Sequence, residues 1–234
     1  MKLLLFDIDG TLILTGGAGV RALNRAFKQV AGIDNAMDGI RPHGKTDFGL
    51  IREVYQSRRH DGHSDEMAVR ILDAYVEHLR EEVEQAPRYR VMPGILSFLQ
   101  THKDNPQFSF GLATGNIERG ARIKLERGNL NAYFRFGGFG SDAENRTHLV
   151  RRAAEMGMQC CGQQIDPRDV FVIGDTPLDV AAGREAGFQT VAVATSDYTR
   201  EQLEACGADL VMSDFEQDGE RFLRLVGALH KKGR

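Results

Sequence analysis

The stretch LLLFDIDGTL at residues 3–12 decides the fold that we expect for this chain. The apolar run at its start is short and ends close to a glycine, which is typical of a buried strand. Asp7 and Asp9 follow this run, and side chains two residues apart on a strand point to the same side. Both carboxylates should therefore enter one small space, where they need a counter-charge or an added proton. A hard cation such as Mg²⁺ would serve, although the pair alone could also be an acidic turn that closes a strand.

Length and charge restrict the classes of function. A chain of 234 residues can form one large domain or a core with a smaller module. Its 30 lysines and arginines nearly balance its 33 aspartates and glutamates, for a net charge of −3. This balance argues against nucleic acid or a membrane surface as a partner bound by bulk charge. The apolar run before Asp7 is too short for a signal peptide, and no run approaches the roughly 20 apolar residues of a membrane span.

The cysteines show no pattern of metal ligands. Cys160 and Cys161 are adjacent and Cys206 stands alone, so we expect reduced thiols. Together with the charge and the N-terminus, this predicts a soluble, cytoplasmic protein. The sequence carries no signal for the oligomeric state.

Strand-like and helical patterns alternate over most of the chain. The expected strands are Lys2–Phe6, Phe108–Ala113, Phe134–Phe139, Val170–Ile173, Thr190–Val193 and Leu210–Met212. The expected helices between them are Ile95–His102, Ile117–Arg127, Thr147–Met156, Leu178–Ala186, Arg200–Cys206 and Phe215–Lys231. Continuous apolar strands are typical of a parallel sheet covered on both faces. The alternation predicts a doubly wound, Rossmann-like α/β core with right-handed crossovers.

Residues 16–88 interrupt this alternation. They contain no convincing strand, and their patterns predict helices at Val20–Val30, Phe48–Arg58 and Glu66–Gln85. Glycines open the segment and prolines close it, and both are turn signals. We therefore expect an all-helical cap of residues 16–88 inserted into a core of residues 1–15 and 89–234, with joints that can hinge. The alternative is that these helices only cover one face of the sheet.

Polar residues follow several of the expected strands. In open α/β sheets, ligands bind at the carboxyl ends of the strands. Each residue there could be structural when taken singly, as a helix cap or a surface charge. Together they bring acids, a hydroxyl, a helix start suited to phosphate and a cation to one edge of the sheet. The candidates are Asp7, Asp9, Gly10, Thr11, Thr114, Gly115, Asn116, Arg146, Asp175 and Asp179.

These segments resemble the motifs of the haloacid dehalogenase (HAD) superfamily. DIDGT at residues 7–11 is similar to the first motif, Thr114 after its apolar run to the second, and GDTPLD at residues 174–179 to the fourth. The third motif is usually a lysine, and Arg146 occupies its place here. Arginine keeps the positive charge and can bind a phosphoryl oxygen bidentately. The helical insertion resembles the mobile cap of members similar to phosphoglycolate phosphatase and β-phosphoglucomutase.

The resemblance implies a Mg²⁺-dependent phosphatase that acts on a small phosphorylated metabolite through an aspartyl-phosphate. Asp7 would be the nucleophile, and Asp9 would protonate the leaving alkoxide and then deprotonate the attacking water. Asp7, the backbone carbonyl of Asp9 and Asp175 would hold Mg²⁺, with Asp179 in a supporting role. The implied phosphate ligands are Gly10, Thr11, Thr114, Gly115, Asn116 and Arg146.

Other activities remain open at this level. Dehalogenases of this superfamily lack the second aspartate, so Asp9 favours phosphate esters. Phosphonoacetaldehyde hydrolases add a Schiff-base lysine in the cap, and Lys45 keeps that chemistry as an alternative. Phosphomutases use the same acids and are separated only by their product. A non-catalytic, phosphate-responsive binding module is a further alternative, against which the intact acid set argues.

The substrate is expected to be recognised by the cap. Arg41, His43 and Lys45 are the candidate contacts. Their basic character would suit a second anionic group on the substrate, as in phosphoglycolate.

Overall fold

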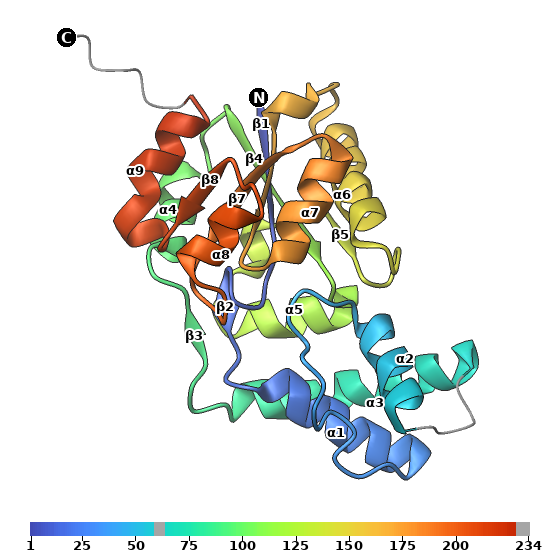
Figure 1. The fold of residues 1–234 in the computed structure, drawn as a ribbon. Coiled ribbons are helices and arrows are strands. Elements are labelled where there is room, and N and C mark those ends of the chain that lie inside the picture. The colour runs from blue at the N-terminus through green and yellow to red at the C-terminus, as the bar shows by residue number, and fades with distance from the viewer. Residues whose placement is uncertain (59–63, 228–234) are drawn as a thin grey trace, which may run out of the picture.

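The computed structural model describes residues 1–58 and 64–227 of the chain. Figure 1 shows a sheet with helices on both faces and a further group of helices beyond one end of the sheet. Within that part of the chain, the main sheet has six strands in the order β5-β4-β1-β6-β7-β8, and every neighbouring pair is parallel. The strands are β1 (Lys2–Phe6), β4 (Phe108–Thr114), β5 (Gly137–Phe139), β6 (Val170–Gly174), β7 (Gln189–Val193) and β8 (Leu210–Met212). The prediction of a doubly wound α/β core is confirmed.

The central strand β1 is buried on both faces. Leu4 and Phe6 pack into an apolar cluster on one face, and Leu3 and Leu5 pack into a cluster on the other. This alternation explains why the strand reads as one continuous apolar run. The first face is covered by α4 (Ile95–His102), α5 (Glu118–Glu126) and α9 (Phe215–Leu225), and the second by α6 (Arg146–Cys161) and α7 (Pro177–Ala186). The short helix α8 (Arg200–Ala205) packs beside α7.

Several boundaries differ from those expected, most of them by one or two residues, and helix α6 continues to Cys161 where an end at Met156 was expected. The strand expected from residue 134 begins only at Gly137, because a 3₁₀ turn (η1, Asn131–Tyr133) precedes it. Phe134 and Phe136 are apolar because they fill the clusters on opposite faces of the sheet. Helix α9 ends at Leu225, and the remainder of the helix expected to Lys231 lies partly outside the described residues.

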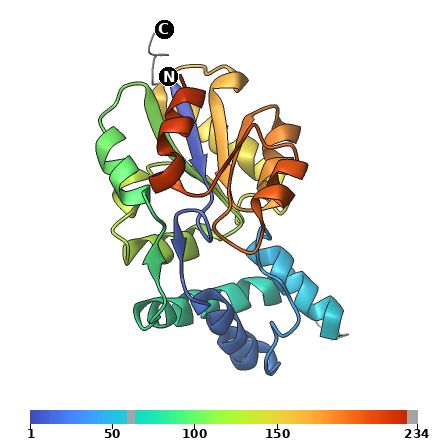
Figure 2. The same cartoon turned by 60° about the vertical axis from the view of Figure 1, so that its left-hand side comes forward.

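Helices α1 (Ala18–Ala31), α2 (Asp47–Arg58) and α3 (Asp65–Glu84) form the group beyond the carboxyl ends of the strands. Figure 2 shows the same placement from a second direction. Their buried side chains form a separate apolar cluster, to which Ile117 and Ile123 contribute from the region of α5. We call residues 16–88, which carry these helices, the cap. In the part of the chain that the structure describes, no helix is long and apolar enough to span a membrane.

A short antiparallel ribbon joins the core to the cap. Strand β2 (Ile13–Leu14) pairs with β3 (Arg90–Val91), so the outgoing and returning chain lie side by side. The sequence did not predict this ribbon, because two-residue strands are too short to produce a hydrophobic period. The cap is therefore attached through paired backbone, in addition to its apolar contact with α5.

Candidate active site

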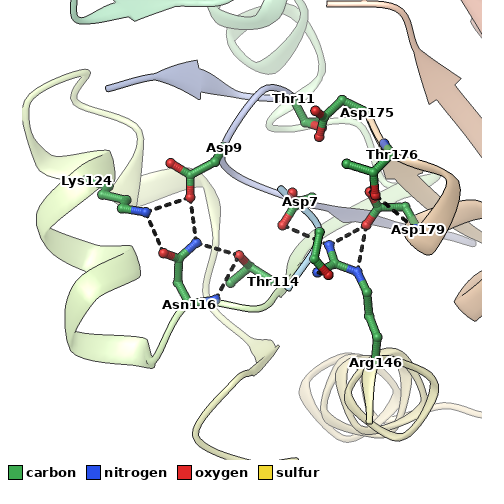
Figure 3. A network of polar contacts seen from close by, with 11 residues as sticks. Asp7, Asp9, Thr11, Thr114, Asn116, Lys124, Arg146, Asp175, Thr176 and Asp179 are labelled. Carbon is green, nitrogen blue, oxygen red and sulfur yellow. Dashed lines mark hydrogen bonds and ion pairs between the residues drawn. The ribbon is translucent and has the colours of Figure 1, made fainter. Parts of the chain in front are cut away.

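Three carboxylates lie together at the carboxyl ends of β1 and β6 (Figure 3). Asp7 directly follows β1, and its N–H donates to the carbonyl of Ile173 at 2.8 Å, which keeps it beside β6. Asp175 directly follows β6, and Asp179 lies in the first turn of α7. One oxygen of each carboxylate lies within 4.8 Å of the other two, and all three residues are buried. This concentration of negative charge requires a positive partner.

Arg146 supplies that positive charge. It is the first residue of α6, whose start is capped by the side chain of Asn145. Its Nη2 lies 3.2 Å from an oxygen of Asp7, and its Nε donates to Asp179 Oδ1 at 2.9 Å. Its Nη1 donates to the carbonyl of Gly44 in the cap at 3.0 Å. The side chain is only 9% exposed, so one buried guanidinium bridges two acids and the cap.

One positive charge does not neutralise three acids. Burial raises the pKa of Asp7 to about 7, with a further increase from Asp179 and Asp9 that Arg146 only partly offsets. Burial, together with the charges of Asp179 and Asp7, raises the pKa of Asp175 well above its usual value. The Oδ2 atom of Asp175 is buried and has no hydrogen-bond partner among the described residues. An all-oxygen donor set with an unpartnered carboxylate oxygen fits a hard divalent cation.

Asp179 is engaged more fully than the other two acids. Its Oδ1 accepts hydrogen bonds from Arg146, and its Oδ2 accepts from the N–H and the hydroxyl of Thr176 at 3.1 and 2.7 Å. Both oxygens are thus used within the protein. This arrangement suits the supporting role proposed for Asp179, because its carboxylate orients Arg146.

Gly10 and Thr11 support Asp175. Gly10 has a φ of +87°, and a Cβ on it would lie 2.3 Å from Asp175 Oδ2, so only glycine fits. The hydroxyl of Thr11 donates to Asp175 Oδ1 at 3.3 Å. Both were expected to bind phosphate, but Thr11 is directed at the acid and does not line the cavity described below.

The side chain of Asp9 is directed away from that of Asp7, although both line the cavity described below. Strand β1 ends at Phe6, and the carbonyl of Ile8 then accepts bonds from the N–H groups of residues 11–13. The two-residue period of a strand therefore no longer applies at Asp9. Figure 3 shows Asp7 directed toward Arg146 and Asp9 directed to the other side. The two carboxylates therefore share the cavity but not a counter-charge, because Asp7 pairs with Arg146 and Asp9 with Lys124.

The counter-charge of Asp9 is Lys124, which no sequence motif identifies. Lys124 Nζ donates to Asp9 Oδ2 at 2.6 Å, and its side chain is 6% exposed. Burial alone would raise the pKa of Asp9, but Lys124 and the amide of Asn116 outweigh it and hold the pKa below its usual value. The signal available in the sequence was a lysine within the apolar face of α5, between the buried residues Ile123 and Leu125.

The segment after β4 connects these groups. Thr114 is fully buried, and its hydroxyl oxygen accepts from the Nδ2 and the N–H of Asn116 at 2.8 and 3.3 Å. The hydroxyl proton of Thr114 is thereby left for a phosphoryl oxygen. Asn116 Nδ2 also donates to Asp9 Oδ2 at 2.8 Å. The N–H groups of Asn116 are thus engaged within the protein, contrary to the expectation that its backbone binds phosphate.

A cavity of about 430 Å³ lies between the core and the cap. Asp7 and Asp9 line its core side, and its volume is in the range of about 300–1,000 Å³ that is typical of small-molecule sites. Further lining residues are Gly10, Thr114, Gly115, Asn116, Lys124 and Arg146 from the core and Tyr75, His43 and Lys45 from the cap. Nearly all the site residues expected from the sequence therefore meet around one space.

The basic cap residues differ in their placement. His43 Nδ1 lies 3.1 Å from an oxygen of Asp197, and Lys45 Nζ lies 2.5 Å from an oxygen of Glu53. Arg41 is not among the residues that line the cavity. Two other cations, Arg88 and Arg90, do line it, although no motif marks them. They lie at the returning side of the ribbon, which only the tertiary structure brings to this wall.

The cap touches the segment after β4 directly. The N–H of Asp47 donates to the carbonyl of Gly115 at 2.9 Å, and its carboxylate accepts from the N–H of Ile117 at 2.8 Å. Burial raises the pKa of Asp47 to about 6, although Lys124 and this bond act against the shift. Gly115 passes so close to the cap that a Cβ on it would lie 2.2 Å from the carbonyl oxygen of Lys45.

The chain was compared with known proteins. The model of a family described as haloacid dehalogenase-like hydrolase matches residues 4–193. A protein of Dickeya dadantii named "Probable phosphatase IndB" is 27% identical over 237 residues, which cover 97% of this chain and 93% of that one. A phosphoglycolate phosphatase of Aquifex aeolicus is 25% identical over 196 residues, which cover 81% and 83%. Phosphoglycolate phosphatase 1 of Pseudomonas aeruginosa is 29% identical over 199 residues, which cover 82% and 69%.

Solved structures share the fold. A hydrolase from Pseudomonas syringae superposes with a TM-score of 0.74 at 23% identity, covering 96% of this chain and 99% of that one. CbbY from Rhodobacter sphaeroides, solved in complex with phosphate, superposes with a TM-score of 0.72 at 19% identity, covering 94% and 96%. At these identities the likeness shows the fold alone.

Proposed function

Since the chain belongs to the haloacid dehalogenase-like hydrolase family, we propose that it hydrolyses phosphoric monoesters of small metabolites. The observation that carries this proposal is the buried pairing of Asp7 with Arg146 at the wall of the cavity between core and cap. A nucleophilic carboxylate beside a fixed guanidinium suits the transfer of an anionic phosphoryl group. The names of the curated relatives, which are phosphatases, support the same reaction.

The first step is transfer of the phosphoryl group to Asp7. A carboxylate oxygen of Asp7 attacks phosphorus, the bond to the ester oxygen breaks, and the electron pair stays on the leaving oxygen. Asp9, which has taken up a proton before this step, gives that proton to the leaving oxygen. Arg146 and the hydroxyl of Thr114 stabilise the charge on the non-bridging phosphoryl oxygens.

The second step releases phosphate. Asp9, now a carboxylate, takes a proton from a water molecule as the water oxygen attacks the phosphorus of the aspartyl-phosphate. The bond between phosphorus and Asp7 breaks, which restores the carboxylate and frees inorganic phosphate. One residue therefore acts first as acid and then as base, which matches the position of Asp9 in the cavity wall.

A divalent cation completes the proposed site, and we propose that it is Mg²⁺. Asp7 and Asp175 would hold it with the backbone carbonyl of Asp9, and it would neutralise the charge between the carboxylates and the phosphate. The unpartnered oxygen of Asp175 supports this assignment. Asp179 lies in the same cluster, but both of its oxygens are already engaged.

The ion pair of Lys45 weighs against a phosphonate hydrolase. A Schiff base requires an amine that can reach the substrate carbonyl, whereas Lys45 Nζ is engaged with Glu53 at 2.5 Å. A phosphomutase uses the same acids as a phosphatase, so its distinction rests on the product.

The proposed function is tested with a panel of phosphorylated metabolites and p-nitrophenyl phosphate. We expect release of inorganic phosphate that requires Mg²⁺ and stops with a chelator. Formation of an isomeric sugar phosphate in place of free phosphate would identify a mutase. Absence of turnover on the whole panel in the presence of Mg²⁺ would contradict the proposal and favour a binding module. Repeating the panel with Lys45→Ala shows whether Lys45 contributes to selectivity.

The substitution Gly115→Ala is expected to impair catalysis by displacing the cap. The added Cβ would overlap the carbonyl oxygen of Lys45, so the cap must move away from the core. Misplacement by about 1 Å can cost about 10²-fold in rate, and we expect a loss in kcat/KM of that order. The matched control is Gly219→Ala, because no atom lies within 4 Å of a Cβ at Gly219. Equal kcat/KM in both variants would show that the cap does not need this contact.

A further inference from the structure

Lys124 is a buried ammonium group that the proposed mechanism does not use. It projects from the core helix α5 into the wall of the cavity, and its side chain is 6% exposed. Its Nζ donates to Asp9 Oδ2 and to Asn116 Oδ1, both at 2.6 Å. The hydroxyl of Tyr75 lies nearby, since a Cβ on Gly19 would be 3.6 Å from Lys124 Nζ and 3.7 Å from the Tyr75 hydroxyl. Lys124 is thus held by Asp9 and Asn116 and has a polar neighbour in the cap.

These contacts hold one oxygen of Asp9 and leave the other open. Oδ2 accepts from Lys124 and from Asn116 Nδ2, at 2.6 and 2.8 Å. For Oδ1, the residues that the structure describes provide no hydrogen bond, while the side chain of Asp9 is 33% exposed and lines the cavity. Asn116 is itself held by Thr114 at 2.8 Å. The rotamer of Asp9 is therefore set by two donors at Oδ2.

The cap contacts helix α5, which carries Lys124. Tyr75 belongs to the cap helix α3 and is 1% exposed, so its hydroxyl can lie beside Lys124 only when the cap is docked. Asp47 of the cap accepts a hydrogen bond from Ile117, just before the start of α5. Near the other end of α5, Arg127 donates to the carbonyl of Ala86 at 2.9 Å. Helix α5 is thus held by the cap at both of its ends.

We propose that Lys124 is a positioning residue that orients Asp9 for proton transfer, and that its proximity to Tyr75 makes this orientation depend on docking of the cap. The inference rests on the proposed phosphatase function and deepens it. Proton transfer needs the acid within about 2.6–3.2 Å of the leaving oxygen. A carboxylate anchored through Oδ2 can present Oδ1 at a constant place, whereas an unanchored one rotates.

The dependence of the rate on the leaving group tests this proposal. p-Nitrophenolate leaves without a proton, whereas phenolate from phenyl phosphate needs one. We expect Lys124→Met to slow single-turnover release of phenol by about 10²-fold and release of p-nitrophenol by less than about 3-fold, with KM for both esters little changed. Neither ester carries a second anionic group, so loss of direct substrate binding would not produce this pattern. Parallel losses on both esters, or a rise in KM with kcat preserved, would overturn the proposal.

Three further variants separate orientation from stability. Tyr75→Phe keeps the ring and should show the same leaving-group dependence to a smaller extent, because only the hydroxyl contributed by the cap is lost. Lys124→Arg keeps the charge and should restore part of the phenol rate. Lys103→Met removes an exposed lysine of the core that pairs with its neighbour Asp104, and should leave both rates unchanged. The thermal midpoint of each variant shows whether it is folded.

The outcomes distinguish the two proposals. An active wild-type protein with an unchanged leaving-group dependence in Lys124→Met would overturn the role of Lys124 alone. If Tyr75→Phe kept the leaving-group dependence of the wild type while Lys124→Met altered it, the link to the cap would be overturned. A wild-type protein that is inactive on every ester would overturn the proposed function and this inference with it.

Discussion

Asp7→Asn is expected to reduce steady-state phosphate release from p-nitrophenyl phosphate by about 10⁴-fold or more, as removal of the nucleophile does in other covalent enzymes. The amide has the same shape as the carboxylate but cannot attack phosphorus. Phosphate release is measured with Mg²⁺ in saturating amounts, so that loss of one cation ligand is not the cause. The matched control is Asp104→Asn, whose side chain is 89% exposed. Activity within tenfold of the wild type would exclude Asp7 as the nucleophile.

The same substitution should stabilise the protein when no divalent cation is present. Burial raises the pKa of Asp7 from 3.8 to about 7, so the folded state binds a proton more readily than the unfolded state. The wild type therefore loses stability as the pH rises from about 4 to about 7, by on the order of 4 kcal/mol from this group. Asparagine does not titrate, so the variant does not lose this stability. In urea unfolding with a chelator, the free energy of unfolding of the variant should therefore rise relative to that of the wild type between pH 4 and 7. A constant difference between pH 4 and 8 would contradict the raised pKa.

Arg146→Met is expected to lower both activity and stability. The side chain is buried and bridges Asp7, Asp179 and the cap, and its removal leaves two buried carboxylates without their cation. Breaking such a pair typically costs about 3–5 kcal/mol in the free energy of unfolding. Loss of a charge that stabilises the transferring phosphoryl group should reduce kcat by about 10²–10³-fold. Denaturant unfolding and phosphate release measure the two effects.

Addition of Mg²⁺ should restore part of the stability of Arg146→Met but little of its activity, because the cation can neutralise Asp7 without replacing the guanidinium at the phosphate. Arg146→Lys keeps the charge and should lose less stability and less activity than Arg146→Met. Arg152→Met is the matched control on the same helix, because Arg152 is exposed and pairs with Glu155 at 3.6 Å. If both methionine variants behaved alike, Arg146 would have no special role in the site.

Much of the core could be predicted because its signals are local. The apolar run of β1, the acids after β1 and β6 and the glycine at position 10 are each encoded within a few residues. A parallel sheet brings the carboxyl ends of its strands to one edge, so these local signals also predict which residues meet. Asp7, Thr114, Arg146 and Asp175 are found together for this reason.

Contacts between distant segments could not be predicted in the same way. Lys124 reads as an ordinary helical lysine until the fold places it against Asp9, 115 residues away in sequence. Asp9 itself turns from Asp7 because β1 ends at Phe6, which depends on pairing with both neighbouring strands. The ribbon between β2 and β3 and the approach of Gly115 to the cap likewise exist only between segments that are far apart along the chain.

By itself, the sequence determined the α/β core, the edge of the sheet that carries the site and the acids that line it, because strand periods and strand ends are properties of short segments. Only the tertiary structure decided which cation each acid receives, namely Arg146 for Asp7 and Lys124 for Asp9. Charge pairing depends on distances of a few ångströms between side chains from different elements. No pattern within a single segment contains those distances.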